Sequence, residues 1–115
     1  MKKIYHLGSC STNIKILKEL NLENVELQDI KKNQMSASQV EELKNLAGSY
    51  EALFSRKAMK YRSLQLNKKI LSENDYKSHI IEEYTFLKRP VAIVDGEIFI
   101  GNSKKNIEAL KAKLF

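Results

Sequence analysis

Two strand-like segments separated by one helical segment occupy the first thirty residues, and this pattern constrains the fold more than any other. Residues 3–7 form a short run in which apolar side chains alternate with others, and residues 24–30 alternate between polar and apolar side chains. Between them, apolar side chains recur every three or four residues, which predicts a helix from Ser11 to about Leu20. A strand, a helix and a strand in so short a stretch predict a βαβ unit, whose two strands run parallel.

The last part of the chain predicts a hairpin followed by a helix. Two apolar runs of four residues each flank Asp95-Gly96, and Asp-Gly in that setting is a strong β-hairpin signal. Residues 103–114 then show helical spacing, with Ser103 or Asn102 as the expected N-cap.

The middle of the chain contains only helical signals. The first helix there has two alternative capping boxes, Ser36 with Gln39 and Ser38 with Glu41. The whole pattern predicts an α/β fold with a four-stranded mixed sheet, interrupted by an all-helical insertion of about fifty residues.

Length and composition suit one domain spanning residues 1–115. We expect residues 1–30 and 88–115 to form the sheet-containing core and residues 31–87 to form the insertion. Asn21 stands where the first helix should end with a left-handed residue.

The charge and cysteine content narrow the cellular setting. The chain has 20 Lys and Arg residues against 14 Asp and Glu residues, a net charge of +6, and this excess suits a solvated surface or an anionic substrate. No helix carries a basic stripe interleaved with aromatics, so direct nucleic-acid binding is not expected. With one cysteine, no internal disulfide is available, and no apolar run is long enough for a membrane span. These features predict a cytoplasmic protein without a bound metal or cofactor.

The only cysteine, Cys10, lies in the junction between the first strand and the first helix. A helix N-terminus stabilises anions, including a cysteine thiolate, so Cys10 is a candidate nucleophile. The alternative is a buried cysteine that acts as a small apolar side chain. The polar neighbours Ser9, Ser11 and Thr12 favour the reactive interpretation, and Ser9 or Ser11 is expected to cap the helix. Gly8 permits a close approach or an unusual backbone angle.

Three motifs occur in order along the chain: Ile-Tyr-His-(x)3-Cys at residues 4–10, Leu-Phe-Ser-Arg-Lys-(x)3-Tyr-Arg-Ser-Leu at 53–64, and Phe-Leu-Lys-Arg-Pro-Val at 86–91. Together they resemble the arsenate reductase (ArsC)/Spx family, and the similarity runs nearly end to end. The resemblance implies a thioredoxin-like fold.

The resemblance also implies roles for individual residues. Cys10 matches the nucleophile that attacks arsenic, and His6 matches the histidine held to help activate it. Arg56 and Arg89 match arginines that bind the oxyanion, which suits their planar donor groups. Pro90 matches a proline that follows a cis peptide bond beside the active site.

The first-turn residues Ser11, Thr12 and Asn13 are expected to bind the substrate as well. Two departures from the family pattern stand out. Residues 101–105 contain no arginine where a third one is expected, and Asn13 replaces the second cysteine of Cys-x-x-Cys relatives. Any adduct on Cys10 therefore needs an external thiol for its resolution.

These features predict a thiol-dependent oxidoreductase that resembles the arsenate reductases coupled to glutathione or glutaredoxin. Its expected partners are an oxyanion or disulfide substrate and an external reductant such as glutathione, glutaredoxin or thioredoxin. One alternative is a glutathione-dependent thiol reductase without arsenate activity. Another is a non-catalytic regulator that, like the Spx branch, binds RNA polymerase.

Overall fold

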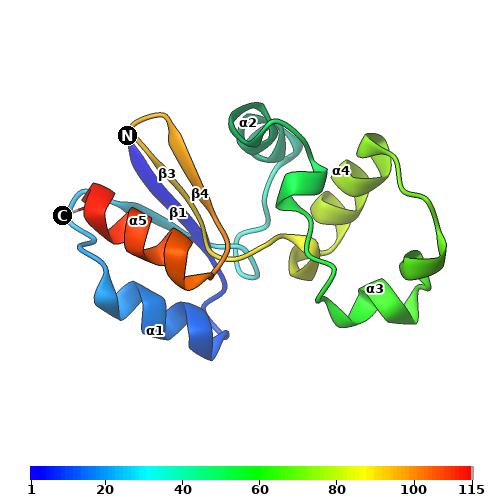
Figure 1. Ribbon diagram of the computed structural model, residues 1–115, viewed down its shortest axis with the longest axis horizontal. Coiled ribbons are helices and arrows are strands. Elements are labelled where there is room, and N and C mark those ends of the chain that lie inside the picture. The colour runs from blue at the N-terminus through cyan, green and yellow to red at the C-terminus, as the bar shows by residue number, and fades with distance from the viewer. Residues whose placement is uncertain (115) are drawn as a thin grey trace. The chain divides into compact units, whose positions relative to one another are not determined.

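The computed structural model describes residues 1–114 of the chain (Figure 1). In chain order the elements are β1 (Lys2–His6), α1 (Ser11–Glu19), β2 (Glu26–Asp29), α2 (Ala37–Ala47), η1 (Glu51–Leu53), α3 (Met59–Ser63), η2 (Leu66–Lys68), α4 (Glu73–Glu82), η3 (Tyr84–Phe86), β3 (Val91–Val94), β4 (Glu97–Ile100) and α5 (Lys104–Leu114), where η denotes a 3-10 helix.

The chain divides into two compact units. The sheet unit contains Met1–Gln34 and the segment from Arg89 onward, and the helical unit contains Met35–Lys88. Every element described between β2 and β3 is helical, apart from an isolated antiparallel bridge between Phe54 and Leu87. That all of this forms a single domain stays a prediction.

The sheet has the strand order β2-β1-β3-β4. β1 runs parallel to β2 and antiparallel to β3, and β3 and β4 form an antiparallel hairpin, so the predicted four-stranded mixed sheet is confirmed. One consequence is that β1 ends at His6, β2 ends at Asp29, β3 begins at Val91 and β4 ends at Ile100 on the same side of the sheet. We call this side the Cys10 edge, because the loop that carries Cys10 leaves β1 there.

Helices α1 and α5 lie together on one face of the sheet (Figure 1). Their apolar faces join strand residues in one buried cluster: Ile4, Ile16, Leu20, Ala92, Val94, Phe99, Ile107, Leu110 and Leu114. Burial of such a cluster is the main favourable term that holds the two helices on the sheet.

An aromatic cluster forms the centre of the helical unit. The ring of Phe54 stacks on Phe86 with centroids 5.0 Å apart, and the centroid of the Tyr76 ring lies 4.9 Å from that of Phe54. The backbone pairs alongside, since the Ser55 N–H donates to the Phe86 carbonyl at 2.6 Å and the Lys88 N–H donates to the Leu53 carbonyl at 2.8 Å.

Local turn and capping signals agree with the structure in most places. Ser36, not Ser38, forms the capping box of α2 with Gln39. In the hairpin, Asp95 and Gly96 both have positive φ, 50° and 85°, as a two-residue turn of this kind requires.

The expected left-handed residue after α1 is wrong. Leu20, the C-cap, is extended, and the positive φ of 60° falls at Asn24 instead. The physical reason is that the Asn21 side chain accepts a hydrogen bond from the Glu23 N–H at 3.2 Å and donates to the Leu114 carbonyl at 3.2 Å. These bonds favour a side-chain-stabilised turn in place of a glycine-like helix stop.

Across residues 1–114, every helix is too short or too polar to cross a lipid bilayer.

We predict that Ser36→Ala lowers the free energy of unfolding by about 1 kcal/mol, because it removes the acceptor for the Gln39 N–H. Ser38→Ala is the matched control and should change stability by less than about 0.5 kcal/mol. Urea unfolding followed by circular dichroism measures both. Equal losses in the two variants would contradict the assignment of Ser36 as the cap.

Candidate active site

Cys10 directly precedes α1, at the end of a tight turn. Its N–H donates to the Leu7 carbonyl at 3.0 Å, and its own carbonyl accepts from the Ile14 N–H at 3.0 Å. With φ of −89° and ψ of 117°, Cys10 is the N-cap of the helix, and its side chain is half-buried. The thiol therefore lies at the positive end of the helix dipole.

No described side chain caps the first turn of α1, so the expected capping by Ser9 or Ser11 is wrong. The reason is positional, because Cys10 itself occupies the N-cap and places Ser9 before it and Ser11 after it. Both serines are exposed. The first N–H groups of a helix have no intrahelical acceptor, and at α1 no side chain in the described part of the chain caps them. This arrangement can stabilise a thiolate or a bound oxyanion.

The side chain of Asn13 is buried and hydrogen-bonded within the protein. Its side chain is 1% exposed, and its Oδ1 accepts the Leu7 N–H at 2.9 Å. The structure therefore does not support the predicted substrate-binding role of Asn13, because this acceptor already holds the turn before Cys10. Ser11 and Thr12 are exposed and remain candidates for substrate contact.

His6 is the last residue of β1 and lies opposite Asp29 of β2 in the strand register. Its backbone carbonyl accepts the Ile30 N–H at 2.9 Å. Its Nδ1 atom is buried and has no hydrogen-bond partner among the described residues. His6 thus lies at the Cys10 edge and directly precedes Leu7, the first residue of the turn that ends at Cys10.

Arg89 and Pro90 lie at the same edge. The peptide bond between them is cis, as the resemblance implies. Val91, the next residue, pairs with Tyr5 of β1, and the Pro90 carbonyl accepts the Gly101 N–H at 2.8 Å. The structure therefore brings the backbone of Arg89 to the edge where the Cys10 loop begins.

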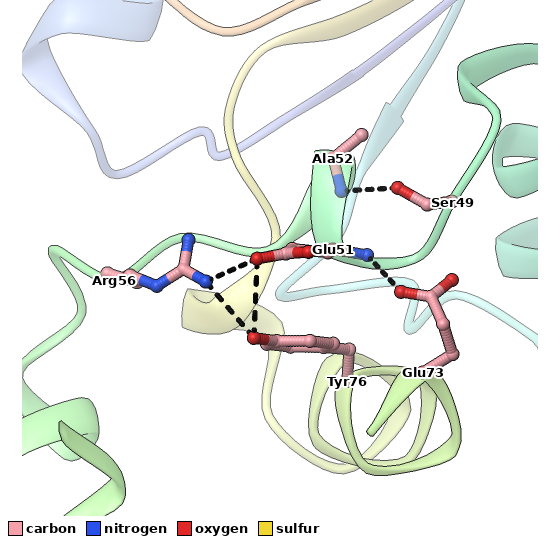
Figure 2. A network of polar contacts seen from close by, with 6 residues as sticks. All are labelled: Ser49, Glu51, Ala52, Arg56, Glu73 and Tyr76. Atoms are coloured by element: carbon pink, nitrogen blue, oxygen red, sulfur yellow. Dashed lines mark hydrogen bonds and ion pairs between the residues drawn. The ribbon is translucent and has the colours of Figure 1, made fainter. Parts of the chain in front are cut away.

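Arg56 belongs to the helical unit and forms a polar network there (Figure 2). Its Nη2 donates to the Glu51 carboxylate at 2.7 Å and to the Tyr76 hydroxyl at 3.0 Å. The neighbouring Glu51 carboxylate raises the pKa of Arg56. About half of each charged side chain is exposed, so an anion that binds Arg56 must compete with Glu51 in water.

The segment after β4 carries lysine where the resemblance implies a third arginine. Ser103 caps α5 by accepting the Asn106 N–H at 3.2 Å, so of the two expected caps the structure selects Ser103. Lys104 and Lys105 are exposed in the first turn of that helix. They can supply positive charge near the Cys10 edge but not a planar donor fork.

Asp29 is a neighbour of the Cys10 loop that no sequence pattern indicated. If position 8 carried a Cβ atom, that atom would lie 2.3 Å from the Asp29 Oδ2 atom. The glycine is therefore needed for this close approach and not for a left-handed backbone angle. The only sequence signal was the glycine itself, which cannot name its neighbour.

Within residues 1–114, three or more His, Cys, Asp or Glu side chains nowhere gather in a way that could hold a metal ion.

We predict that Asn13→Ala destabilises the protein by about 1–3 kcal/mol, because it leaves the buried Leu7 N–H without an acceptor. Thr12→Ala, one residue earlier and exposed, should cost less than about 0.5 kcal/mol. Thermal and urea unfolding measure both variants. A loss for Asn13→Ala no larger than that of the control would show that the hydrogen bond is not needed.

Comparison with known proteins places this geometry in a family. A model described as the ArsC family matches residues 5–110. A search of curated proteins gives no match.

Several solved structures share the fold across their whole length. The arsenate reductase from Vibrio cholerae has a TM-score of 0.76 at 20% identity, over 99% of this chain and 97% of its own. A possible arsenate reductase from Streptococcus mutans has a TM-score of 0.73 at 26% identity, over 96% and 97%. An arsenate reductase (ArsC) related protein from Brucella melitensis has a TM-score of 0.69 at 22% identity, over 94% and 92%. With the family model spanning nearly the whole sequence, the chain belongs to the ArsC family and has its thioredoxin-like fold.

Proposed function

We propose that the protein is a thiol-dependent reductase of a tetrahedral oxyanion of the arsenate type, with Cys10 as the nucleophile. Membership in the ArsC family supports thiol-dependent reductase chemistry. The observation that carries the proposal is the position of Cys10, at a helix N-terminus with no capping side chain and on the same sheet edge as Arg89.

The chemistry balances only with an outside reductant. The Cys10 sulfur forms a bond to As(V), and a protonated oxygen leaves as water. An external thiolate then attacks the Cys10 sulfur and the S–As bond breaks. The electron pair of that bond stays on arsenic, so As(III) is released while Cys10 and the external thiol form a mixed disulfide. A second external thiol reduces this disulfide and restores Cys10. The chain contains no other cysteine, so glutathione, glutaredoxin or thioredoxin is the proposed source of both thiols.

The charged and polar groups at the edge suit the other steps. Arg89 can bind two oxyanion oxygens through its planar donors, and the N–H groups at Ser11 and Thr12 can bind a third. His6 is the proposed group for proton transfer to or from the reacting sulfur and oxygen atoms.

We expect the protein to reduce arsenate to arsenite in the presence of glutathione and glutaredoxin. Cys10→Ser should abolish this activity, because a hydroxyl does not replace a thiolate as nucleophile. Arg89→Lys should raise KM for arsenate by roughly tenfold, since a lysine loses the paired donors. Arg62→Lys, an exposed change in the helical unit, is the matched control and should leave KM unchanged. No arsenite from a folded protein with an accessible Cys10 would rule out this substrate.

The network around Arg56 generates a separate prediction. Glu51→Gln removes the negative charge that competes for Arg56, so KM for arsenate should fall by about two- to fivefold if this guanidinium binds the oxyanion. Glu73→Gln is the control, because Glu73 accepts the Glu51 N–H at 3.0 Å without touching Arg56 (Figure 2). An unchanged KM in Glu51→Gln would remove Arg56 from the proposed substrate site.

A second candidate function is glutathione-dependent reduction of disulfides without arsenate activity. It is favoured by one observation, the exposed lysines 104 and 105 where a third oxyanion-binding arginine is expected. Turnover of a small model disulfide by the wild-type protein, with no arsenate reduction under the same conditions, would select this function.

A further inference from the structure

Asp29, at the end of β2, touches the loop that carries Cys10. The Oδ2 and Cγ atoms of Asp29 lie 2.3 Å and 3.3 Å from the point where a Cβ atom at Gly8 would stand. The carboxylate therefore fills the space beside Gly8 that any other residue would need for its side chain. Gly8 is the second residue of the turn that ends at Cys10.

The carboxylate is held in this place by the turn after β2. The Lys31 N–H donates to Asp29 Oδ1 at 3.0 Å, and the Asp29 carbonyl accepts the Asn33 N–H at 2.8 Å. Because the side chain is short and bonded to its own turn, it has little freedom to move away from Gly8.

The hydrogen bonds also keep Asp29 charged. Partial burial by itself would raise the pKa of its carboxyl. Backbone N–H groups of Lys31, Gly8 and Lys32 nevertheless donate to it and hold its pKa below the ordinary value. The charge of His6 acts in the same direction.

We propose that Asp29 is a positioning residue for the nucleophile: its carboxylate holds Gly8, so that the Leu7–Cys10 turn keeps the sulfur at the N-terminus of α1. The turn is then held from two sides, by Asn13 on the Leu7 N–H and by Asp29 on Gly8. This inference rests on the proposed role of Cys10 as the reacting group and adds the residue that sets its place.

The negative charge of Asp29 and its contact with Gly8 have opposite effects on the rate at which Cys10 reacts. Variants of Asp29 can therefore separate the two effects. A carboxylate near a thiolate disfavours it by repulsion, so removal of charge alone should speed the reaction of Cys10. Loss of position should slow it, because the sulfur leaves the N–H groups of α1. Asp29→Asn removes the charge but keeps an acceptor oxygen beside Gly8, whereas Asp29→Ala removes both.

The test measures the rate of alkylation of Cys10 by iodoacetamide at about pH 7 in the full chain. Asp29→Ala should slow it by about five- to tenfold, and Asp29→Asn should stay within about threefold of wild type. The rate at about pH 6, relative to the plateau at high pH, should fall in Asp29→Ala, which a general loss of stability would not cause. Asp95→Ala is the matched control, since Asp95 pairs with the N-terminus and lies in the hairpin turn. The other ionisable residues near the edge are the same in every variant: His6, Lys31, Lys32, Arg89, Lys104 and Lys105.

A double variant tests the contact itself. Gly8→Ala should slow alkylation, because the new methyl group displaces the carboxylate. In the Asp29→Ala background the same change should add less than about twofold, since the clash is gone. The proposal would be overturned if the fold-changes in alkylation rate of Gly8→Ala and Asp29→Ala simply multiplied in the double variant. An alkylation rate left unchanged by Asp29→Ala would overturn it as well. If Asp29→Ala does not fold, Asp29→Ser, whose side chain is too short to reach Gly8, replaces it with the same expected result.

The experiment distinguishes this inference from the proposed function, because alkylation needs neither arsenate nor a disulfide. Slower alkylation in Asp29→Ala, together with no reductase activity in the wild-type protein, would support the positioning role and reject the reductase. An unchanged alkylation rate in Asp29→Ala, together with reductase activity in the wild-type protein, would reject the positioning role and support the reductase.

Discussion

The pairing of β1 with a parallel strand on one side and an antiparallel strand on the other is the constraint on which the site depends. This pairing brings the ends of β1 and β2 and the beginning of β3 to one edge. A register slip of one residue would move every side chain of β1 to the opposite face, and the buried cluster with α1 and α5 forbids it. The apolar core thereby fixes where Cys10 and Arg89 can lie.

The N-terminus of α1 differs from those of α2, α4 and α5 in how its N–H groups are used. Those three helices have serine caps, Ser36, Ser72 and Ser103. At α1 the side chains of Asn13 and, as proposed, Asp29 stabilise the turn that precedes the helix and not the first turn of the helix itself. The turn is fixed while the helix N-terminus stays open to the thiol, which suits a site that must stabilise a transient anion.

The polar network in the helical unit shows a different use of charge. Arg56 already has a carboxylate and a hydroxyl as partners, so its positive charge is partly neutralised before any ligand arrives. Exposed ion pairs of this type contribute little stability, and their larger effect is on which anion the guanidinium can accept. The proposed substrate site therefore depends more on Arg89 and the start of α1 than the resemblance alone implies.

The sequence by itself determined the features whose signals are local. A capping box at the start of α2, the Asp95-Gly96 turn and the strand and helix periods each lie within a few residues, so propensity and hydrogen-bond chemistry suffice to predict them. The choice of Ser36 over Ser38 as the cap came from the structure. Only the tertiary structure decided that Asn13 is buried, that Arg56 is paired with Glu51 and that Asp29 touches Gly8. The Asn13 contact spans a turn, and the Asp29 contact joins the end of β2 to the loop after β1, which α1 separates from it in the sequence. No periodicity in the chain encodes such contacts, because they exist only after the core has fixed the register of the sheet.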